Sequence, residues 1–282
     1  MSGTLFVVAT PIGNLDDITA RALRVLGQVT LIAAEDTRRT HHLLMRYAIP
    51  TPTTSLHEHN EARKLPALID RLKRGEDIAV VSDAGTPTIS DPGQRVVRAA
   101  IDAGIRVEPI PGPSATVAAL AASGFAGTSF SFQGFPPARS KDRKKWLLSL
   151  SRIGGLVVFF EAPHRIVATL GDMIEYVGDC EVSVGRELTK IHEEFLRGPI
   201  SKVLMELKSP IGEFTVVADI GLSTNSRDRI SATPSDMAAE FGRMTISGGL
   251  SKRQAISQIA SRHGVSTNQV YAAVEQAKKL VE

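Results

Sequence analysis

The chain has 282 residues, of which 43% are hydrophobic and 22% are charged, and its formal net charge is +3 at pH 7. This composition is ordinary for a chain that buries one large core or two medium ones. It contains no run of about 18 apolar residues, the length a membrane helix needs, and no charged-then-apolar export signal at its amino terminus. The single cysteine, Cys180, excludes an internal disulfide and a cysteine metal site. We therefore expect a cytoplasmic protein that makes no membrane contact.

The positive charge is unevenly distributed along the chain. Residues 1–224 hold 25 basic and 25 acidic side chains, whereas residues 225–282 hold 8 basic and 5 acidic ones. The whole excess therefore lies in the tail. A positive surface attracts an RNA phosphate backbone and makes binding salt dependent.

The first predicted unit is a strand, a tight loop and a helix. Residues 5–9 form a short apolar strand, residues 10–17 a loop, and residues 18–26 a helix. This arrangement suits a nucleotide-like ligand at the carboxyl edge of a parallel sheet. The loop lacks the glycines of a pyrophosphate cradle, which argues against a dinucleotide or a triphosphate.

The second unit is the most informative part of the chain. Residues 77–82 carry adjacent β-branched side chains without polar alternation, which predicts a parallel strand covered on both faces. Small and polar residues follow before helical periodicity resumes after Gly93. The polar ones include a cluster of Ser82, Asp83, Thr86 and Ser90. A connection built only for its turns explains the glycines and prolines of this loop but not that cluster, so we expect a ligand here.

A third unit of the same kind follows. A short strand at residues 106–108 leads through the loop 109–115 into a small-residue helix at 115–122. We expect Pro113 in the first helical turn and Ser114 as a partner for a free amide. Because parallel strands end at one edge of a sheet, the three loops are expected to converge.

The small residues 121–128 are expected to separate the first domain from a second one. The second domain is predicted to contain strands at residues 129–132, 156–160, 181–185 and 214–220. Five cations fall within residues 139–145 and precede Trp146. They predict either an RNA clamp in which Trp146 stacks on a base or a solvated helix start anchored by Trp146.

Polar groups also follow two strands of the second half. Residues 161–165 come after a buried strand and begin a helix, and His164 there is either a base or a hydrogen-bonded structural residue. Residues 185–190 follow the next strand, where two cations and an acid form either an internal ion pair or part of a cleft. The His57-Glu58-His59 run suggests no third ligand, so we expect no metal site.

The tail begins with a polar linker and continues with three short amphipathic helices. They are predicted at residues 236–244, 252–262 and 267–279. Ser251 and Ser266 are suitable amino-terminal caps. The outline is that of a helix-turn-helix, which either docks nucleic acid or braces a protein.

Several motifs in one order resemble those of the tetrapyrrole methylase superfamily, whose members bind S-adenosylmethionine between two α/β domains. They are the loops at residues 10–19, 82–93 and 111–115. Further motifs at residues 35–38, 161–165 and 186–190 narrow the resemblance to the family of ribosomal RNA small subunit methyltransferases I. That family methylates the ribose 2′-hydroxyl of a cytidine in the decoding region of 16S rRNA.

The resemblance implies an α/β fold with two α/β/α domains of the tetrapyrrole methylase type and a cofactor cleft between them. We expect domains at residues 1–122 and 123–222, a linker at 223–235, and a small helical domain at 236–282 that contacts RNA. The expected partners are 16S rRNA or the small ribosomal subunit and, because dimers are common in the superfamily, a second copy of the chain.

The resemblance assigns the S-adenosylmethionine site to loops of both domains. The residues are Pro11, Ile12, Gly13, Ala84, Gly85, Thr86, Ile89, Ser114, Ala115, Glu161, Leu188, Gly212, Glu213 and Phe214. Candidate RNA contacts are Arg38, Arg139, Lys141, Arg143, Lys144, Lys145, Arg186, Lys252 and Arg253. Methyl transfer to a hydroxyl also needs a group that takes the proton. The candidates for that role are Asp36, Glu187 and Lys190.

Two other functions remain open at this point. The chain could methylate a small molecule of the tetrapyrrole type on the same fold. It could also be a non-catalytic regulator that binds nucleic acid and senses S-adenosylmethionine. The loop at residues 10–14 reads Thr-Pro-Ile-Gly-Asn where porphyrin-modifying relatives have more glycine, which argues against a tetrapyrrole substrate.

Overall fold

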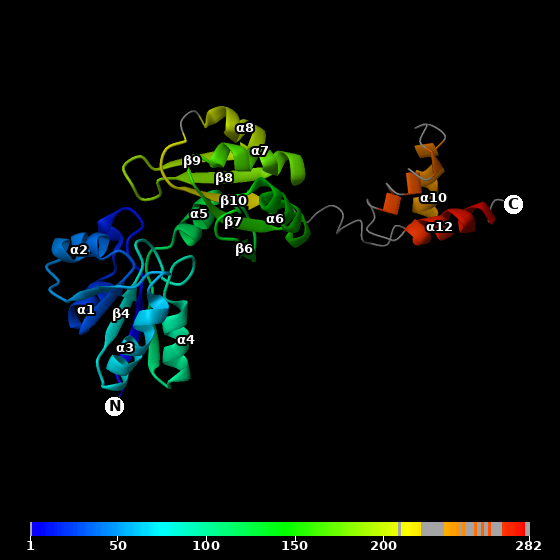
Figure 1. The fold of residues 1–282 in the computed structure, drawn as a ribbon. Helices are drawn as coiled ribbons and strands as arrows, with labels where there is room; N and C mark the ends of the chain where they lie inside the picture. The colour runs from blue at the N-terminus through cyan, green and yellow to red at the C-terminus, as the bar shows by residue number, and fades with distance from the viewer. Residues whose placement is uncertain are drawn as a thin grey trace.

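The computed structural model describes residues 2–207, 210–220, 234–242, 244–245, 251–252, 255–256, 259–260 and 267–279. Two five-stranded sheets, each covered by helices, form two α/β domains (Figure 1). Among the described residues, no helix has the length and apolar character needed to cross a bilayer.

The first sheet is parallel throughout, with the strand order β3-β2-β4-β1-β5. Its strands are β1 (Thr4–Val8), β2 (Leu31–Ala34), β3 (Thr53–Ser55), β4 (Ile78–Val81) and β5 (Arg106–Ile110). All four residues of β4 are buried, and its side chains alternate between two apolar clusters on opposite faces. This confirms the buried parallel strand predicted from the unbroken apolar run.

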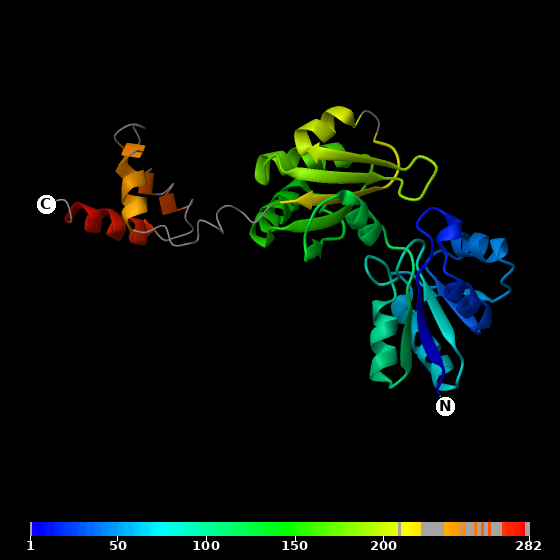
Figure 2. The same cartoon turned by 180° about the vertical axis from the view of Figure 1, so that it is seen from behind.

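Helices cover both faces of the first sheet (Figures 1 and 2). One apolar cluster contains buried residues of α1 (Ala20–Gln28) and α2 (Thr37–Arg46). The other contains buried residues of α3 (Glu61–Lys73) and α4 (Gln94–Asp102). A short 3-10 helix, η1 (Leu15–Asp17), lies in the first loop. The result is a doubly wound three-layer domain.

The second sheet is mixed, with the order β6-β7-β10-β8-β9. Its strands are β6 (Phe130–Phe132), β7 (Leu156–Glu161), β8 (Glu181–Arg186), β9 (Glu194–Pro199) and β10 (Phe214–Asp219). Because β10 runs antiparallel to both β7 and β8, its first residue, Phe214, pairs with Glu161 on one side and Arg186 on the other. The end of β7, the end of β8 and the start of β10 therefore share one edge.

One face of the second sheet packs on α6 (Ser140–Ile153), α7 (Ile166–Tyr176) and α8 (Ile200–Glu206). The other face packs on α5 (Ala115–Ser123), whose Ala119 is fully buried beside β7 and β10. The domain boundary expected after residue 122 assigns this helix to the first domain, but its small side chains let it lie directly on the second sheet. Because α5 packs on the second sheet, the boundary between the domains lies in the loop before α5.

The described part of the tail contains α10 (Pro234–Gly242) and α12 (Thr267–Lys279). These helices contact each other and share a small apolar cluster with Ala255, Ile259 and Ala260. The apolar spacing predicted for residues 267–279 is confirmed by the burial of Val270, Ala273 and Val274. The predicted cap Ser266 and most of the predicted linker lie outside the described residues.

Candidate active site

The three loops of the first domain meet because their strands β4, β1 and β5 are neighbours in the sheet. Thr10 and Gly85 exchange two backbone hydrogen bonds, of 2.9 and 3.0 Å, which join the first loop to the second. The Thr86 hydroxyl donates to the Pro113 carbonyl at 3.3 Å and joins the second loop to the third. The predicted convergence is thus confirmed.

Local backbone conformation shapes the second loop. Gly85 and Gly93 have φ angles of +81° and +114°, and Thr88 has a φ of +74°, a region that favours glycine. A Cβ atom on Gly93 would lie 3.1 Å from Val80 Cγ1, so the loop returns closely over its own strand. At the third loop, Ser114 caps α5 by accepting a hydrogen bond from the Val117 amide at 3.4 Å.

Pro113 precedes this cap and does not occupy the first helical turn as predicted, because the hydroxyl of Ser114 takes the cap position itself. The Pro113 carbonyl is thereby left to accept from Thr86. The proline helps to connect the loops and lies outside the helix.

The second domain contributes a loop after β8 and the segment before β10. Glu187 accepts hydrogen bonds from the Glu213 amide and from Lys190 Nζ, both at 2.9 Å, and Lys190 also pairs with Glu213 at 3.0 Å. Glu187 and Thr189 have positive φ angles of 50° and 66°. A Cβ atom on Gly212 would lie 2.5 Å from Glu187 Cγ, so only glycine allows these two segments to approach so closely.

The two domains touch where the first loop meets the loop after β8. The Asn14 amide donates to Thr189 Oγ1 at 3.0 Å. A Cβ atom on Gly13 would lie 2.9 Å from the Leu188 carbonyl oxygen, 2.8 Å from Thr189 Oγ1 and 2.6 Å from Lys190 Cγ. Gly13 thus allows close contact between the two walls of the cleft.

A cavity of about 390 Å³ opens between these walls. From the first domain and the loop before α5 it is lined by Ile12, Arg39, Asp83, Ala84, Gly85, Thr86, Ile89, Ser90, Asp91 and Ser114. From α5 and the rest of the second domain it is lined by Ala115, Thr116, Phe135, Phe160, Glu161, Ala162, Pro163, Leu188, Glu213, Phe214 and Thr215. Of the residues assigned to the cofactor from the sequence, Pro11, Gly13 and Gly212 are outside this lining; the last two shape it by their lack of a side chain.

The cavity combines apolar walls with a few polar groups, as small-molecule sites do, and its volume falls in the usual range. The Ile, Leu and Phe side chains suit a flat aromatic ring. Asp83, Asp91 and Glu213 give it negative charge, which suits a sulfonium and an ammonium group. The residues present therefore fit S-adenosylmethionine.

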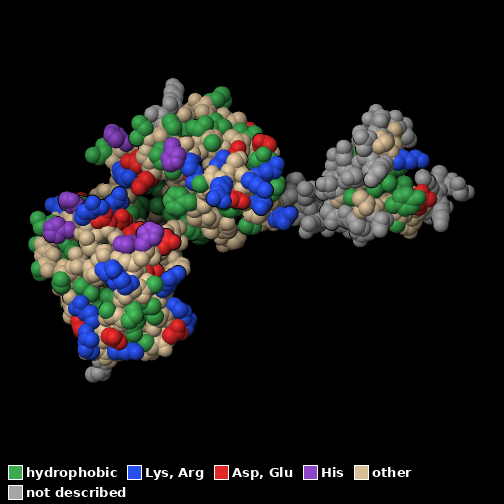
Figure 3. Space-filling view, in the orientation of Figure 1, with side chains coloured by type: hydrophobic (Ala, Val, Ile, Leu, Met, Phe, Trp, Pro, Cys, Tyr) green, Lys and Arg blue, Asp and Glu red, His purple; other side chains and the backbone are tan. Residues whose placement is uncertain are grey.

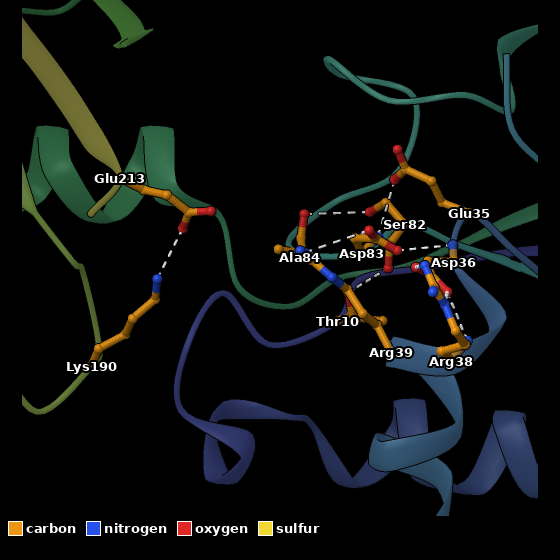
Figure 4. A network of polar contacts seen from close by, with 10 residues as sticks. All are labelled: Thr10, Glu35, Asp36, Arg38, Arg39, Ser82, Asp83, Ala84, Lys190 and Glu213. Atoms are coloured by element: carbon orange, nitrogen blue, oxygen red, sulfur yellow. Dashed lines mark hydrogen bonds and ion pairs between the residues drawn. The ribbon is translucent and has the colours of Figure 1, made fainter. Parts of the chain in front are cut away.

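Two of the candidates for proton acceptance, Asp36 and Lys190, lie on opposite sides of the cleft (Figure 4). Glu187 is on the side of Lys190, with which it pairs. Asp36 caps α2 and accepts two hydrogen bonds from the Arg38 guanidinium, at 2.7 and 3.1 Å, which hold the pKa of its carboxyl well below its usual range. Hydrogen bonds from Lys190 and from the Glu213 amide lower the pKa of Glu187. Both carboxylates are therefore ionised but weakly basic.

Lys190 is held as a cation. Partial burial lowers the pKa of its ammonium group, but hydrogen bonds to Glu187 and Glu213 outweigh this effect, so the pKa is raised. In this arrangement Lys190 orders the loops of the second domain and has no free electron pair to accept a proton.

Asp91 was not among these candidates, and the pKa of its carboxyl is raised, whereas those of Asp36 and Glu187 are lowered. Burial and the nearby negative charge of Glu35 raise the pKa of Asp91 to about 6, with Asp83 adding to the effect and a hydrogen bond from Ser82 opposing it. The position of Asp91 in the second loop was visible in the sequence. Asp83 belongs to the same loop, but the proximity of Glu35 was not visible, because Glu35 follows β2, which the folded sheet places beside β4.

Glu161 and His164 are placed differently. The Glu161 side chain is fully buried, accepts from the Thr169 hydroxyl at 2.6 Å and pairs with Arg165 at 3.3 Å. It lines the cavity as part of a rigid internal pair. His164 is exposed and does not line the cavity, so the structure gives it no contact with the reacting groups.

The basic segment before Trp146 separates into two kinds of side chain. Arg143 is buried and pairs with Asp172 at 2.7 Å, so it is unavailable to RNA, contrary to the prediction. It lies on the same helical face as the buried Leu147 and Leu150, which explains its inward direction. Trp146 packs edge-on against Phe159 with ring centroids 5.4 Å apart, which favours its role as an anchor.

The other basic candidates lie at the surface. Figure 3 shows Lys and Arg side chains gathered on the second domain near α6. Arg139, Lys141 and Lys145 are exposed, and Lys144 lies over the Tyr176 ring at 4.5 Å. Two further candidates form ion pairs, Arg38 with Asp36 and Arg186 with Glu194. Of the last two candidates, Lys252 is exposed and Arg253 lies outside the described residues.

Within the described part of the chain, no group of His, Cys, Asp and Glu side chains could hold a metal ion. The two histidines of the run at residues 57–59 make an edge-on ring contact at 6.0 Å. His57 Nε2 is 2.8 Å from the Asn60 side-chain amide, so the ring is used in local hydrogen bonding.

The family model for Tetrapyrrole (Corrin/Porphyrin) Methylases matches residues 4–204. The chain belongs to the tetrapyrrole methylase family. This methylase is 42% identical over 272 residues to the ribosomal RNA small subunit methyltransferase I of Synechocystis, which covers 95% of this chain and 96% of the relative. It is 49% identical over 217 residues to the Thermotoga maritima protein of the same name, which covers 76% of this chain and 97% of the relative.

The fold of this tetrapyrrole methylase is also found among solved structures. The uroporphyrin-III C-methyltransferase of Thermus thermophilus, solved in complex with S-adenosylhomocysteine, matches 77% of this chain and 98% of its own chain with a TM-score of 0.56. At 14% sequence identity this is a likeness of fold. Together with the family match it confirms the predicted fold class, and the two curated relatives confirm the narrower resemblance.

Proposed function

We propose that this chain transfers a methyl group from S-adenosylmethionine to the ribose 2′-hydroxyl of a cytidine in the decoding region of 16S rRNA. The observation that carries the proposal is the cavity of about 390 Å³, which is built by loops of both domains in a chain whose full-length relatives are named for methylating small-subunit ribosomal RNA. The cofactor, when bound, supplies an electrophilic methyl group.

Positioning is the main task of the protein in such a reaction, because an in-line displacement requires the acceptor oxygen, the methyl carbon and the leaving sulfur to be collinear. The loops joined by Thr10, Gly85 and Thr86 would hold the adenosine part from the first domain. Leu188 and Phe214 would cover it from the second. The contact of Gly13 with the loop after β8 would keep the two walls at a fixed distance.

Lys190 would act through the loops it orders. Its Nζ holds Glu187 and Glu213 together, and Glu213 lines the cavity. Arg139, Lys141, Lys145 and the basic tail would attract the RNA backbone. The homodimer and the cytoplasmic location expected from the sequence stay predictions.

The test is methyl transfer to small ribosomal subunits isolated from a strain that lacks its own methyltransferase of this type. We expect radioactive methyl from S-adenosylmethionine to enter 16S rRNA, and mass spectrometry of nuclease digests to find it on a cytidine ribose. Label in a soluble tetrapyrrole instead would support the small-molecule alternative. RNA binding without any loss of methyl from the cofactor would support the regulator.

A further inference from the structure

A second cavity adjoins the one described above. It has a volume of about 480 Å³ and is formed by the first domain alone. Two residues, Ser90 and Asp91, line both cavities. A molecule in the second cavity would therefore meet a molecule in the first at this segment.

The second cavity has features of a nucleoside site. The rings of His57 and His59 offer stacking surfaces, and carboxylates such as Glu35 can accept from an exocyclic amine. His57 Nδ1 is buried and has no hydrogen-bond partner within the protein. A buried polar atom of this kind is costly unless a ligand or water satisfies it. The exposed Arg95 at the rim is available to a phosphate.

We propose that the second cavity receives the acceptor nucleoside and that Asp91 takes the proton of its ribose hydroxyl. The inference rests on the proposed function, since it assumes that the first cavity holds the methyl donor. The hydroxyl oxygen bonds to the methyl carbon as the carbon–sulfur bond breaks, and the electron pair stays on sulfur. The hydroxyl proton passes to the Asp91 carboxylate and from there to solvent.

Asp91 is the carboxylate best suited to this step. Asp36 and Glu187 are tied to Arg38 and Lys190, which weakens them as bases. A base that titrates near the working pH combines sufficient basicity with sufficient ionised fraction. Burial and the negative charges of Glu35 and Asp83 raise the pKa of Asp91 to about 6.

Other charged groups line the two cavities. On the donor side they are Arg39, Glu161 and Glu213. On the acceptor side they are His57, Glu58, His59, Glu61 and Arg95. Glu61 already accepts from the amides of Arg95 and Val96, and Glu35 from the amide of Asp83.

The decisive variant is Asp91→Asn, which keeps the size of the side chain and removes its basicity. We expect kcat on small subunits to fall by about 10²–10⁴-fold, whereas affinity for S-adenosylhomocysteine should change far less. The wild-type rate is expected to rise with pH up to about 6 and then level, and this rise is expected to be absent in Asp91→Asn and retained in Asp91→Glu. Asp102→Asn, an exposed change at the end of α4 next to Arg98, is the control.

Thermal unfolding without cofactor gives a second readout. The folded-state pKa of Asp91 is raised, so its ionisation between about pH 4 and 6 costs stability. The stability of the wild type relative to Asp91→Asn should therefore fall as pH rises through this interval. His57→Ala should raise KM for the subunit and leave kcat unchanged, because it removes an acceptor contact.

The outcomes separate the two proposals. If the wild-type chain methylates neither subunits nor their RNA, the proposed function fails. If the wild type is active and folded Asp91→Asn works at the wild-type rate, the assignment of Asp91 is overturned. If His57→Ala leaves KM unchanged, the second cavity does not receive the acceptor.

Discussion

Gly13→Ala tests how closely the two walls of the cleft must approach. The added methyl group would lie 2.9 Å from the Leu188 carbonyl oxygen, against an ordinary contact of 3.4 Å or more. The side chains of Thr189 and Lys190 can rotate, but this peptide oxygen can retreat only if the loop after β8 moves with it. Overpacking of this kind costs about 1–3 kcal/mol, which corresponds to ~5- to 150-fold in affinity.

The assay is calorimetric titration of Gly13→Ala with S-adenosylhomocysteine, together with thermal unfolding. Gly27→Ala is the matched control, because a Cβ atom at Gly27 in α1 meets nothing within 4 Å. We expect the control to bind normally and to be slightly more stable, since alanine favours a helix. Wild-type affinity in a folded Gly13→Ala protein would refute the argument that contact between the domains positions the cofactor.

Trp146→Ala should lower the free energy of unfolding by about 3 kcal/mol, measured by urea denaturation, and leave RNA affinity intact; loss of RNA affinity without loss of stability would favour base stacking instead. Burial raises the pKa of Cys180 to about 11, so a thiol reagent at pH 8 should label the native protein slowly and the unfolded protein fast; rapid native labelling would contradict this burial. The pKa of Glu187 is lowered from 4.5, so its contribution to stability is complete above pH 4.5 and is lost on acidification. Calorimetric scans should therefore show that acidification destabilises Glu187→Gln less than the wild type. Identical pH profiles of the two proteins would exclude a stabilising pair between Glu187 and Lys190.

Local sequence patterns predicted the strands β1, β4 and β5 of the first domain and the loops that follow them, but not β2 and β3. An unbroken apolar run is typical of a parallel strand buried on both faces, and β4 is such a strand. Ser114 was recognisable as a cap because a hydroxyl just before a run of small residues satisfies a free amide. These features depend on near neighbours in the chain.

Other features depend on residues that are distant in the sequence. The edge strand β9 was not predicted, because it is polar, half-exposed and contains Gly198. The packing of α5 on the second sheet could not be read from its small side chains, which fit either domain. The raised pKa of Asp91 depends on its burial and on Glu35, which only the sheet order brings near. The inward direction of Arg143, in contrast, follows from helical periodicity with Leu147 and Leu150.

We infer that the methyl donor binds in the cavity formed jointly by the two domains. A crystal structure of the chain with S-adenosylhomocysteine tests this binding site directly. We expect one molecule per chain, in contact with Ala84 and Thr86 on one side and Leu188 on the other. Density for the compound elsewhere on the protein, with this cavity filled only by water, would contradict it.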